Sequence, residues 1–412
     1  MRIVMSSWTR ALVCASVLTA VATTGWSQSI TWLGVLPTGN SSSAYGVSAN
    51  GSVVVGGARI AGGQIRGFHW TASGGMVDLG ALPGGTGSPA YSVSADGSVV
   101  VGEARNASGS WRAYRWTAAS GLVNLGTLGG PESYAYGISA DGSVVVGEAR
   151  NASGQRRAFR QTAAGGMQEV GTPTGADFSS ARGVSADGSV IVGSCRIFGG
   201  DSFAFRWTAT GGMQDLGTLG GRGSSARGVS ADGSVVVGEA RNAADRVRAF
   251  RWTAAGGMQD LGTLGGDFSS ANGVSADGSV VVGRAADTAS QTRAFRWTAA
   301  GGMENLNITY ASLLTDGSSL TEAHAASSDG RYIVGYGRNA ATNRTEAFLL
   351  DTRGARLEGD VNGDGSVDDA DLLQVLFAFG NTGTNLPEDL NGDGVVDDAD
   401  LLIVLFNFGS GG

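Results

Sequence analysis

The chain has 412 residues, of which 42% are apolar and 70 are glycine, so it is long enough to bury a large core and too apolar to be disordered. The formal net charge at pH 7 is −8, and all 28 basic residues are arginine. Residues 358–412 contain 12 acidic residues and no basic one, so the charge of the remainder is nearly balanced. This distribution excludes the basic footprint of a nucleic-acid-binding protein and a polybasic membrane patch.

Residues 1–27 have the pattern of a secretory signal peptide. Two arginines come at or before the start of the apolar stretch of residues 11–22, and the small residues Gly25 and Ser27 precede the expected cleavage site. We therefore expect a secreted or cell-surface protein. No later stretch reaches the roughly 20 apolar residues that a membrane-spanning helix needs, so no transmembrane segment is expected.

From residue 30 to residue 351 the chain repeats one segment seven times. An Asp-Gly pair, or Asn-Gly in the first copy, marks each repeat and recurs at intervals of 46, 45, 46, 45, 45 and 52 residues. Because one unit of this size cannot bury its own apolar faces, the period indicates supersecondary units that pack on their neighbours. The pairs begin at Asn50, Asp96, Asp141, Asp187, Asp232, Asp277 and Asp329.

The fifth copy shows what one repeat encodes. ARGVS, residues 226–230, predicts a strand, and Asp232-Gly233 predicts a tight hairpin turn with positive φ at both residues. The valine run in SVVVGEA, residues 234–240, predicts a strand that is covered on both faces. RAFRWT and MQDLG, residues 248–253 and 258–262, predict two more strands. Four strands in each period of about 45 residues are typical of a propeller blade.

The two ends of the repeat region predict how the ring closes. The last copy ends with its third strand at residues 346–351, and no sequence like MQDLG follows it. A matching segment, residues 30–36, stands before the first repeat instead. The sequence therefore predicts a mainly β chain with a seven-bladed β-propeller over residues 30–353, in which the N-terminal strand completes blade seven and removes an exposed edge.

The strings GVSADGSVVVG, RAFRWTAAGGM and DLGTLGG resemble the bacterial extracellular repeats called the HAF family. The resemblance covers nearly all of residues 30–351. It implies a secreted or surface-displayed protein, and it brings no catalytic residues to this chain.

No side chain has the spacing of a catalytic group, so we expect no catalytic residues. His69 replaces an arginine of the other copies, and His324 follows an insertion, residues 307–323, without an evident partner. Cys195 is the only cysteine after cleavage and occupies an alanine position, which predicts a small buried residue rather than a reactive thiol. Turn chemistry explains the aspartates of the Asp-Gly pairs. Three glutamates are expected to form ion pairs with the arginine two residues later: Glu103 with Arg105, Glu148 with Arg150, and Glu239 with Arg241.

Variation among the repeats is concentrated on one predicted face. The turns inside the first and second hairpins are almost identical in every copy, whereas the loops between second and third strands, and the links between blades, differ. Recognition of an asymmetric ligand requires copies that differ, although unconstrained loops also vary without function. We therefore expect exposed aromatic residues on this face to bind a carbohydrate or a surface protein. The candidates are Trp111, Tyr134, Phe178, Phe198 and Phe268.

A linker, residues 354–359, precedes a duplicated acidic loop in residues 360–412. The two copies, DVNGDGSVDDAD and DLNGDGVVDDAD, begin 29 residues apart and place oxygen-bearing side chains in the EF-hand-like spacing. Because a hard cation takes six to eight oxygen ligands, this spacing predicts two Ca²⁺ sites rather than a merely solvated acidic tail. The expected ligands, with a backbone carbonyl at the seventh position, are Asp360, Asn362, Asp364, Ser366, Asp368 and Asp371, and Asp389, Asn391, Asp393, Val395, Asp397 and Asp400.

Each loop ends in aspartate, is followed by an apolar helix-forming stretch, and has no helix-forming stretch before it. These features resemble the type I dockerin module over residues 360–409. The resemblance implies two loop–helix halves, a requirement for calcium, and a cohesin-like partner. Dockerins are often attached to enzymes of polysaccharide breakdown.

Three functions agree with these patterns. The first is an exported binding or display protein, with propeller loops that bind a ligand and a calcium-dependent tail that attaches to a partner. The second is a polysaccharide hydrolase or lyase carried in a dockerin–cohesin complex, and the third is a structural coat protein. Turnover of a polysaccharide would favour the second function, and binding without turnover would favour the first.

Overall fold

A computed structural model describes residues 28–353, 359–362, 367–383, 386–391 and 393–410. The predicted signal peptide and most of the predicted linker lie outside these residues. The chain forms two compact units, one over Ser29–Thr352 and one that includes Arg353–Gly412. No helix among the described residues is long and apolar enough to cross a membrane.

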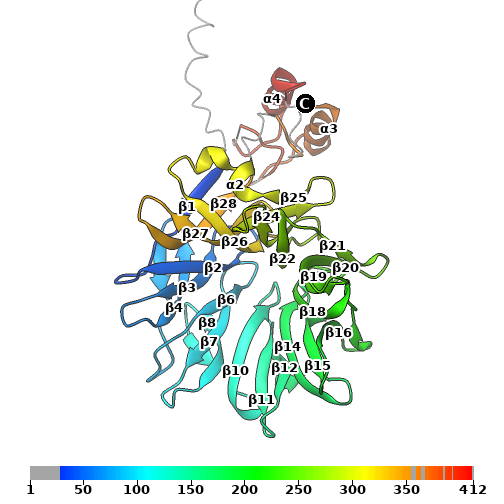
Figure 1. The fold of residues 1–412 in the computed structure, drawn as a ribbon. Helices are drawn as coiled ribbons and strands as arrows, with labels where there is room; N and C mark the ends of the chain where they lie inside the picture. Colours follow the sequence, from blue (N-terminus) through cyan, green and yellow to red (C-terminus); the bar gives the residue numbers. More distant parts are fainter. Residues whose placement is uncertain (1–27, 354–358, 363–366, 384–385, 392, 411–412) are drawn as a thin grey trace, which may run out of the picture. The chain divides into compact units, whose positions relative to one another are not determined.

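The first unit consists mainly of β-strands (Figure 1). They form three four-stranded sheets and two eight-stranded sheets. Each eight-stranded sheet is two antiparallel groups of four joined by one parallel bridge, Ser41 with Thr345 or Arg156 with Phe178, so the strands make seven such groups. We number the groups 1 to 7 in chain order. Groups 1 to 3 contain β2 (Ser41–Val47), β3 (Val54–Arg59), β4 (Ile65–Thr71) and β5 (Gly75–Asp78); β6 (Ala90–Val93), β7 (Val100–Arg105), β8 (Trp111–Thr117) and β9 (Gly121–Asn124); and β10 (Gly129–Ile138), β11 (Val144–Asn151), β12 (Arg156–Thr162) and β13 (Gly166–Glu169). Groups 4 to 6 contain β14 (Ala176–Val184), β15 (Val190–Ile197), β16 (Ser202–Thr208) and β17 (Gly212–Asp215); β18 (Gly220–Val229), β19 (Val235–Asn242), β20 (Val247–Thr253) and β21 (Gly257–Asp260); and β22 (Gly265–Val274), β23 (Val281–Asp287), β24 (Thr292–Thr298) and β25 (Gly302–Asn305). Group 7 contains β26 (Ser319–Ala326), β27 (Tyr332–Asn339), β28 (Arg344–Asp351) and β1 (Ser29–Trp32).

The N-terminal strand completes the last group. β1 pairs antiparallel with β28, with Ser29 opposite Asp351. Ser42 of group 1 joins this pair of strands to the next group, because its Oγ accepts the Ala347 N–H at 2.9 Å and donates to the Gly34 carbonyl at 2.6 Å. The same contact joins successive groups within the chain, through Ser133, Ser224 and Ser269.

The core of each group follows from its repeated sequence. The valines of the second strands are buried on both faces, as β-branched side chains are in a covered strand. In group 5, Phe250 is fully buried and lies opposite Gly238 on the neighbouring strand. A Cβ at Gly238 would lie 2.1 Å from the Ser225 carbonyl and 3.0 Å from the Phe250 ring, so this position requires glycine. The valine and phenylalanine layers pack against those of the neighbouring groups.

The Asp-Gly turns differ from the predicted tight turn. Gly97 has φ +79°, but Asp96 is not among the residues with positive φ. The Gly97 N–H donates to the Ser94 carbonyl at 3.0 Å, which gives a four-residue loop rather than a two-residue turn. Asp96 instead accepts hydrogen bonds from the Ser94 hydroxyl at 2.6 Å and the Ser98 N–H at 3.0 Å, and these bonds lower the pKa of its carboxyl to about 2.

Backbone bonds link these loops from group to group. The Ala95 N–H donates to the Ala140 carbonyl at 2.9 Å, and the Ala140 N–H donates to the Ala186 carbonyl at 3.0 Å. Equivalent bonds join six successive pairs of loops, from Ala49 to Ser328. The uniform sequence of these loops therefore has a structural cause.

The longer interval before group 7 contains α2 (Leu306–Thr309) and a 3₁₀ turn, Ala311–Leu313. Leu306 and Tyr310 are buried against groups 6 and 7. The predicted insertion is therefore shorter than residues 307–323, because β26 already begins at Ser319.

The second unit contains α3 (Asp369–Ala378) and α4 (Asp398–Asn407), which contact each other. Asp368 and Asp397 cap the two helices, each in a capping box with the aspartate three residues later. A small core forms from Val361, Val367, Val375, Val396 and Val404.

Candidate functional site

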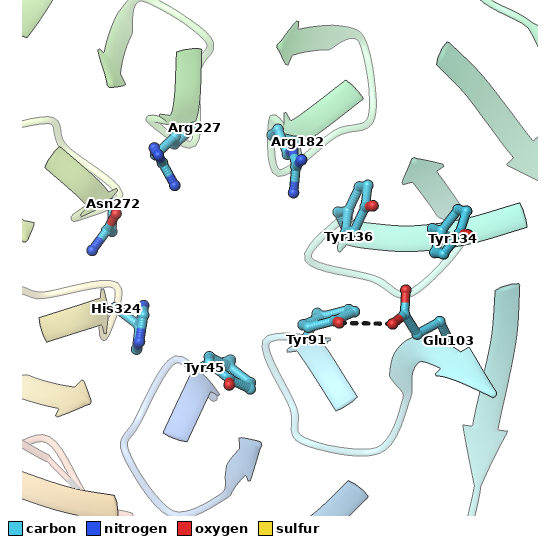
Figure 2. Close-up of a pocket in the computed structure, with 9 residues that line it drawn as sticks. All are labelled: Tyr45, Tyr91, Glu103, Tyr134, Tyr136, Arg182, Arg227, Asn272 and His324. Atoms are coloured by element: carbon cyan, nitrogen blue, oxygen red, sulfur yellow. Dashed lines mark hydrogen bonds between the residues drawn. The ribbon is translucent and has the colours of Figure 1, made fainter. Parts of the chain in front are cut away.

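The first strand of every group places one side chain at the centre of the ring. Contacts between first strands run from β2 through β6, β10, β14, β18, β22 and β26 and return to β2. Side chains alternate along these strands, so that Ala226 is buried between groups and its neighbour Arg227 points to the centre (Figure 2). The equivalent residues lie five positions before each turn residue, and we call them the axial residues: Tyr45, Tyr91, Tyr136, Arg182, Arg227, Asn272 and His324.

The axial residues, with Glu103 and Tyr134, line a cavity of about 400 Å³. Glu103 on β7 and Tyr134 on β10 lie farther from the Asp-Gly loops than the axial residues do, so this cavity lies on the side of the variable loops. All seven axial residues also line a second hollow of about 200 Å³, together with Ser92 and Ile138 on the side of the Asp-Gly loops. The axial side chains therefore separate two hollows on the same axis.

One half of the axial ring is aromatic. The ring centroids of Tyr45 and Tyr91 are 5.6 Å apart, and those of Tyr91 and Tyr136 are also 5.6 Å apart. Both pairs are tilted, at 50° and 53° between planes, so the three rings form a curved wall rather than a flat stack. Tyr134 extends this wall because its ring stacks on Tyr136 at 6.3 Å.

The opposite half carries hydrogen-bond donors. The guanidinium carbon of Arg182 lies 4.1 Å from the ring centroid of Tyr136, and the Arg182 side chain makes no hydrogen bond or ion pair within the described part of the chain. Arg227 contacts Glu239 with a distance of 3.0 Å between Nη2 and Oε1. Asn272 completes this half, and its amide nitrogen is already used in bonds to group 7.

Glu103 is the acidic group of the cavity. Its Oε1 accepts a hydrogen bond from the Tyr91 hydroxyl at 3.0 Å. Burial, and next the nearby Glu148 carboxylate, raise the pKa of Glu103 to about 7 against the lowering effect of Tyr91 and Arg182. Glu103 can therefore gain or lose a proton at neutral pH.

His324 packs against aromatic rings and lies near a carboxylate. Its ring packs 5.0 Å from Tyr45 and 5.8 Å from Tyr336, and its Nδ1 lies 3.9 Å from Oε1 of Glu322. Arg284 holds Glu322 at 3.2 Å. Burial lowers the pKa of His324, so the imidazole is neutral at pH 7. These contacts could not be predicted from the sequence around His324, because they come from a residue two positions away on the same strand and from neighbouring strands.

The five predicted loop aromatics do not form one exposed surface. Phe198 alone among them is exposed, at 81%. The other four are partly buried, and each has an arginine over its ring, so the expectation of exposure is wrong for them. The pairs are Trp111 with Arg105, Tyr134 with Arg156, Phe178 with Arg196, and Phe268 with Arg284. Tyr134 is the one of the five that lines the axial cavity.

The predicted ion pairs along the second strands do not form. The glutamates turn to neighbouring strands instead: Glu103 bonds to Tyr91, Glu148 to Arg156 at 2.8 Å, and Glu239 to Arg227. Cross-strand neighbours on one face are closer than residues two apart in an extended chain, which explains the difference.

The remaining histidine and the cysteine lie away from the axial ring. His69 is half-buried beside Trp116, with 5.7 Å between ring centroids. Cys195 is fully buried, and burial raises the pKa of its thiol. The prediction of a small buried residue at this position is confirmed.

The second acidic loop is the better described of the two. The Asp393 N–H donates to Asp389 Oδ1 at 3.2 Å and to Asn391 Oδ1 at 2.9 Å, which gathers three predicted ligand side chains around one turn. The buried Asp400 carboxylate closes the loop onto α4: its Oδ1 accepts the N–H groups of Leu390 and Asn391, and its Oδ2 accepts that of Asp397. The first loop repeats this closure through Asp371, while Asp364 and Ser366 lie outside the described residues.

None of the axial residues was predicted as a binding residue, although the sequence contains a signal for them. The repeats agree closely on both sides of this position, yet tyrosine, arginine, asparagine and histidine all occur at it. This variation lies inside a strand, at a position that only a residue-by-residue alignment of the copies reveals.

No protein-family model and no curated protein sequence matches the chain. Solved structures share its fold. An oligogalacturonate lyase from Vibrio parahaemolyticus is similar with a TM-score of 0.53 and 10% identity, over 78% of this chain and 93% of the lyase. The β-propeller domain of the Trilobed protease from Pyrococcus furiosus, described as having an open velcro topology, gives a TM-score of 0.50 and 11% identity, over 75% of this chain and 96% of that domain. The first unit therefore has a fold of the β-propeller class.

Proposed function

We propose that this chain is an exported binding protein, a seven-bladed β-propeller whose axial cavity binds a small polar ligand with a ring. The seven four-stranded groups would be its blades, and β1 would close the seventh. The observation that supports this function best is the difference among the axial residues. A position that only fills the core can repeat one kind of residue: the fully buried position of the third strands is phenylalanine in six groups and tyrosine, Tyr114, in the other.

The two halves of the axial ring suit different parts of one ligand. The tyrosine wall offers ring faces for stacking, while Arg182 and Arg227 offer donors for hydrogen bonds. A cavity of about 400 Å³ lies within the range of small-molecule sites, and rigid strands hold the side chains that line it. The variable loops stand on the same side of the ring and could add contacts to a larger carbohydrate or a surface protein.

The acidic unit would bind two Ca²⁺ ions and attach the chain to a cohesin-like partner. The donor set fits a hard cation: carboxylate and amide oxygens of Asp389, Asn391 and Asp393 already lie around one turn, and Val395 and Asp397 would add oxygens. Asp400 Oδ2 accepts a single N–H, which leaves this oxygen a lone pair for the ion. The ion would neutralise the repulsion among these carboxylates and so order the loops.

A binding panel with variants tests the proposed site. The mature chain, beginning at residue 28, would be screened against neutral and acidic oligosaccharides by calorimetry. We expect Tyr136→Ala to weaken binding at least about tenfold, as loss of a stacking aromatic does, while Phe198→Ala leaves it unchanged. Loss of binding in Phe198→Ala alone would place the site on the loops and contradict the axial assignment.

A polysaccharide lyase or hydrolase is the second candidate, and the Tyr91–Glu103 pair favours it. A carboxyl group with a pKa of about 7, hydrogen-bonded to a tyrosine in a cavity, is suited to proton transfer. Incubation of the chain with oligogalacturonate and other polysaccharides, followed by detection of new reducing ends or unsaturated products, tests this candidate. Turnover that disappears in Glu103→Gln would establish an enzyme, and binding without turnover would favour the first proposal.

A further inference from the structure

The charges that line the axial cavity do not balance. Besides His324, whose imidazole is neutral at pH 7, three of its lining side chains can carry charge: Glu103, Arg182 and Arg227. Arg227 forms an ion pair with Glu239, and the carboxyl group of Glu103 accepts a hydrogen bond from the Tyr91 hydroxyl. The guanidinium group of Arg182 has no hydrogen bond or ion pair within the described residues, so it is the cation of this cavity that a ligand can pair with.

We propose that the axial cavity selects a carboxylate-bearing sugar and that Arg182 binds its carboxylate; this rests on the binding function proposed above. A guanidinium group matches a carboxylate with two parallel hydrogen bonds, which gives both strength and orientation. The stack of Arg182 on Tyr136, at 4.1 Å, limits the positions of the guanidinium and leaves its edge for the ligand.

The tyrosine wall fits the remainder of such a ligand. The Tyr91 ring is tilted by 53° from that of Tyr136, which carries Arg182, and the C–H face of a sugar packs on aromatic rings. Asn272 Oδ1 and the Tyr45 hydroxyl also belong to the axial residues that line the cavity. They suit the hydroxyl groups of a sugar, which both donate and accept hydrogen bonds. An apolar carboxylate would leave these polar groups without partners.

Glu103 links this recognition to a proton. Its carboxyl faces Tyr91 on β6, Tyr134 and Tyr136 on β10, and the charged groups of Glu148 and Arg182 on β11 and β14, with Arg105 on its own strand. A ligand carboxylate at Arg182 adds a negative charge near Glu103 and so favours its protonated form. Binding should therefore take up a proton, and the affinity should fall as pH rises above about 7.

Matched acidic and neutral oligosaccharides distinguish the contribution of the carboxylate to binding from that of the sugar ring. Calorimetry would compare oligogalacturonate, oligomannuronate and oligoglucuronate with neutral oligosaccharides that carry a hydroxymethyl group in place of each carboxylate. We expect at least about tenfold preference for an acidic form, lost in Arg182→Gln, because a charge-assisted bidentate contact is worth one power of ten or more. Arg344→Gln, at an exposed arginine on β28 without an ion pair in the described chain, is the matched control and should change nothing.

The proton gives a second measurement. Titration at pH 7 in two buffers with different ionisation enthalpies should reveal proton uptake in the wild-type chain and none in Glu103→Gln, which keeps the contact with Tyr91 but cannot titrate. Melting temperatures would show that both variants are folded.

The outcomes separate this inference from the proposed function. Equal affinity for acidic and neutral partners, or full affinity in Arg182→Gln, would overturn the selectivity while the Tyr136→Ala effect still supports an axial site. Failure of all three acidic oligosaccharides to bind would also overturn it. Full binding in Tyr136→Ala would contradict both proposals.

Discussion

Removal of residues 28–36 should take away most of the stability of the first unit. This segment contains β1 and the residues after it, in which Leu33 is 6% exposed and Leu36 is 2% exposed. Both pack in the apolar cluster that contains Phe68 of group 1, so the segment holds the two ends of the unit together. Burial of two leucines contributes about 3–6 kcal/mol. Without Gly34, the Ser42 hydroxyl also loses the carbonyl to which it donates, and this costs roughly another 1 kcal/mol.

Together these losses approach the roughly 5–15 kcal/mol that stabilises a typical domain. The truncation also exposes the edge of β28, which invites association with other chains. The assay is urea unfolding by circular dichroism, with size-exclusion chromatography, for the chain that begins at residue 28 and the chain that begins at residue 37. Leu33→Ala serves as a graded control and should cost about 2–5 kcal/mol. If the truncated chain unfolds at the same urea concentration with the same slope, the strand does not close the unit and the reasoning is refuted.

Three further predictions concern calcium, pH and the thiol. Chelation should unfold the acidic unit, and calcium at a hundred times the dissociation constant should stabilise it by about 2.7 kcal/mol per site, measured by calorimetric melting. The double variant Asp364→Ala, Asp393→Ala should abolish this stabilisation. A melting temperature that calcium does not change in the unmodified chain would contradict the prediction. Burial raises the pKa of Glu103 from 4.5 to about 7, so between these pH values the folded state binds more protons than the unfolded state. The free energy of unfolding should therefore fall as pH rises through this interval. Glu103→Gln should remove that part of the pH dependence. Cys195 should resist alkylation at pH 8 until the chain is unfolded, and rapid labelling of the native protein would show that the thiol is accessible.

The binding and enzyme proposals for the first unit differ in what Glu103 does. In the binding proposal its proton adjusts the charge of the cavity, and in the enzyme proposal the same proton moves to or from a substrate. Both use the hydrogen bond from Tyr91, at 3.0 Å, and the partial burial that raises the pKa. Glu103→Gln separates the two, because an amide preserves neutral charge in the cavity but cannot transfer a proton.

The apolar side of the second unit agrees with attachment to a partner without identifying it. Phe377 on α3 and Phe406 on α4 are 86% and 84% exposed, at equivalent positions of the two halves. The sequence predicts an apolar helix after each acidic loop, and contact between the two helices hides only part of that apolar surface. The cohesin-like partner stays a prediction that a pull-down with and without calcium would test.

Local sequence determined the strands and their order. The valine runs, the Asp-Gly loops and the period of about 45 residues each act over short distances, so they could be interpreted without tertiary structure. The pairing of the N-terminal strand with the last repeat also followed from the sequence. The last repeat lacks a fourth strand, and the segment before the first repeat is the one unpaired segment that matches it. The turn type was predicted wrongly, since Asp-Gly is compatible with more than one loop and hydrogen bonds from Ser94 and Ser98 favour the longer one.

Only the tertiary structure decided which residues meet at the axis. Tyr91 and Arg182 are separated by two repeats in the chain, and their proximity depends on the direction in which each first strand turns its side chains once seven groups surround one centre. The same packing buries Glu103 beside Tyr91. It also places Glu239 in an ion pair with Arg227 rather than with Arg241, two residues later in the sequence. Charge, burial and partner at the cavity arise from contacts between groups, and the sequence of a single repeat carries no information about its neighbours' side chains.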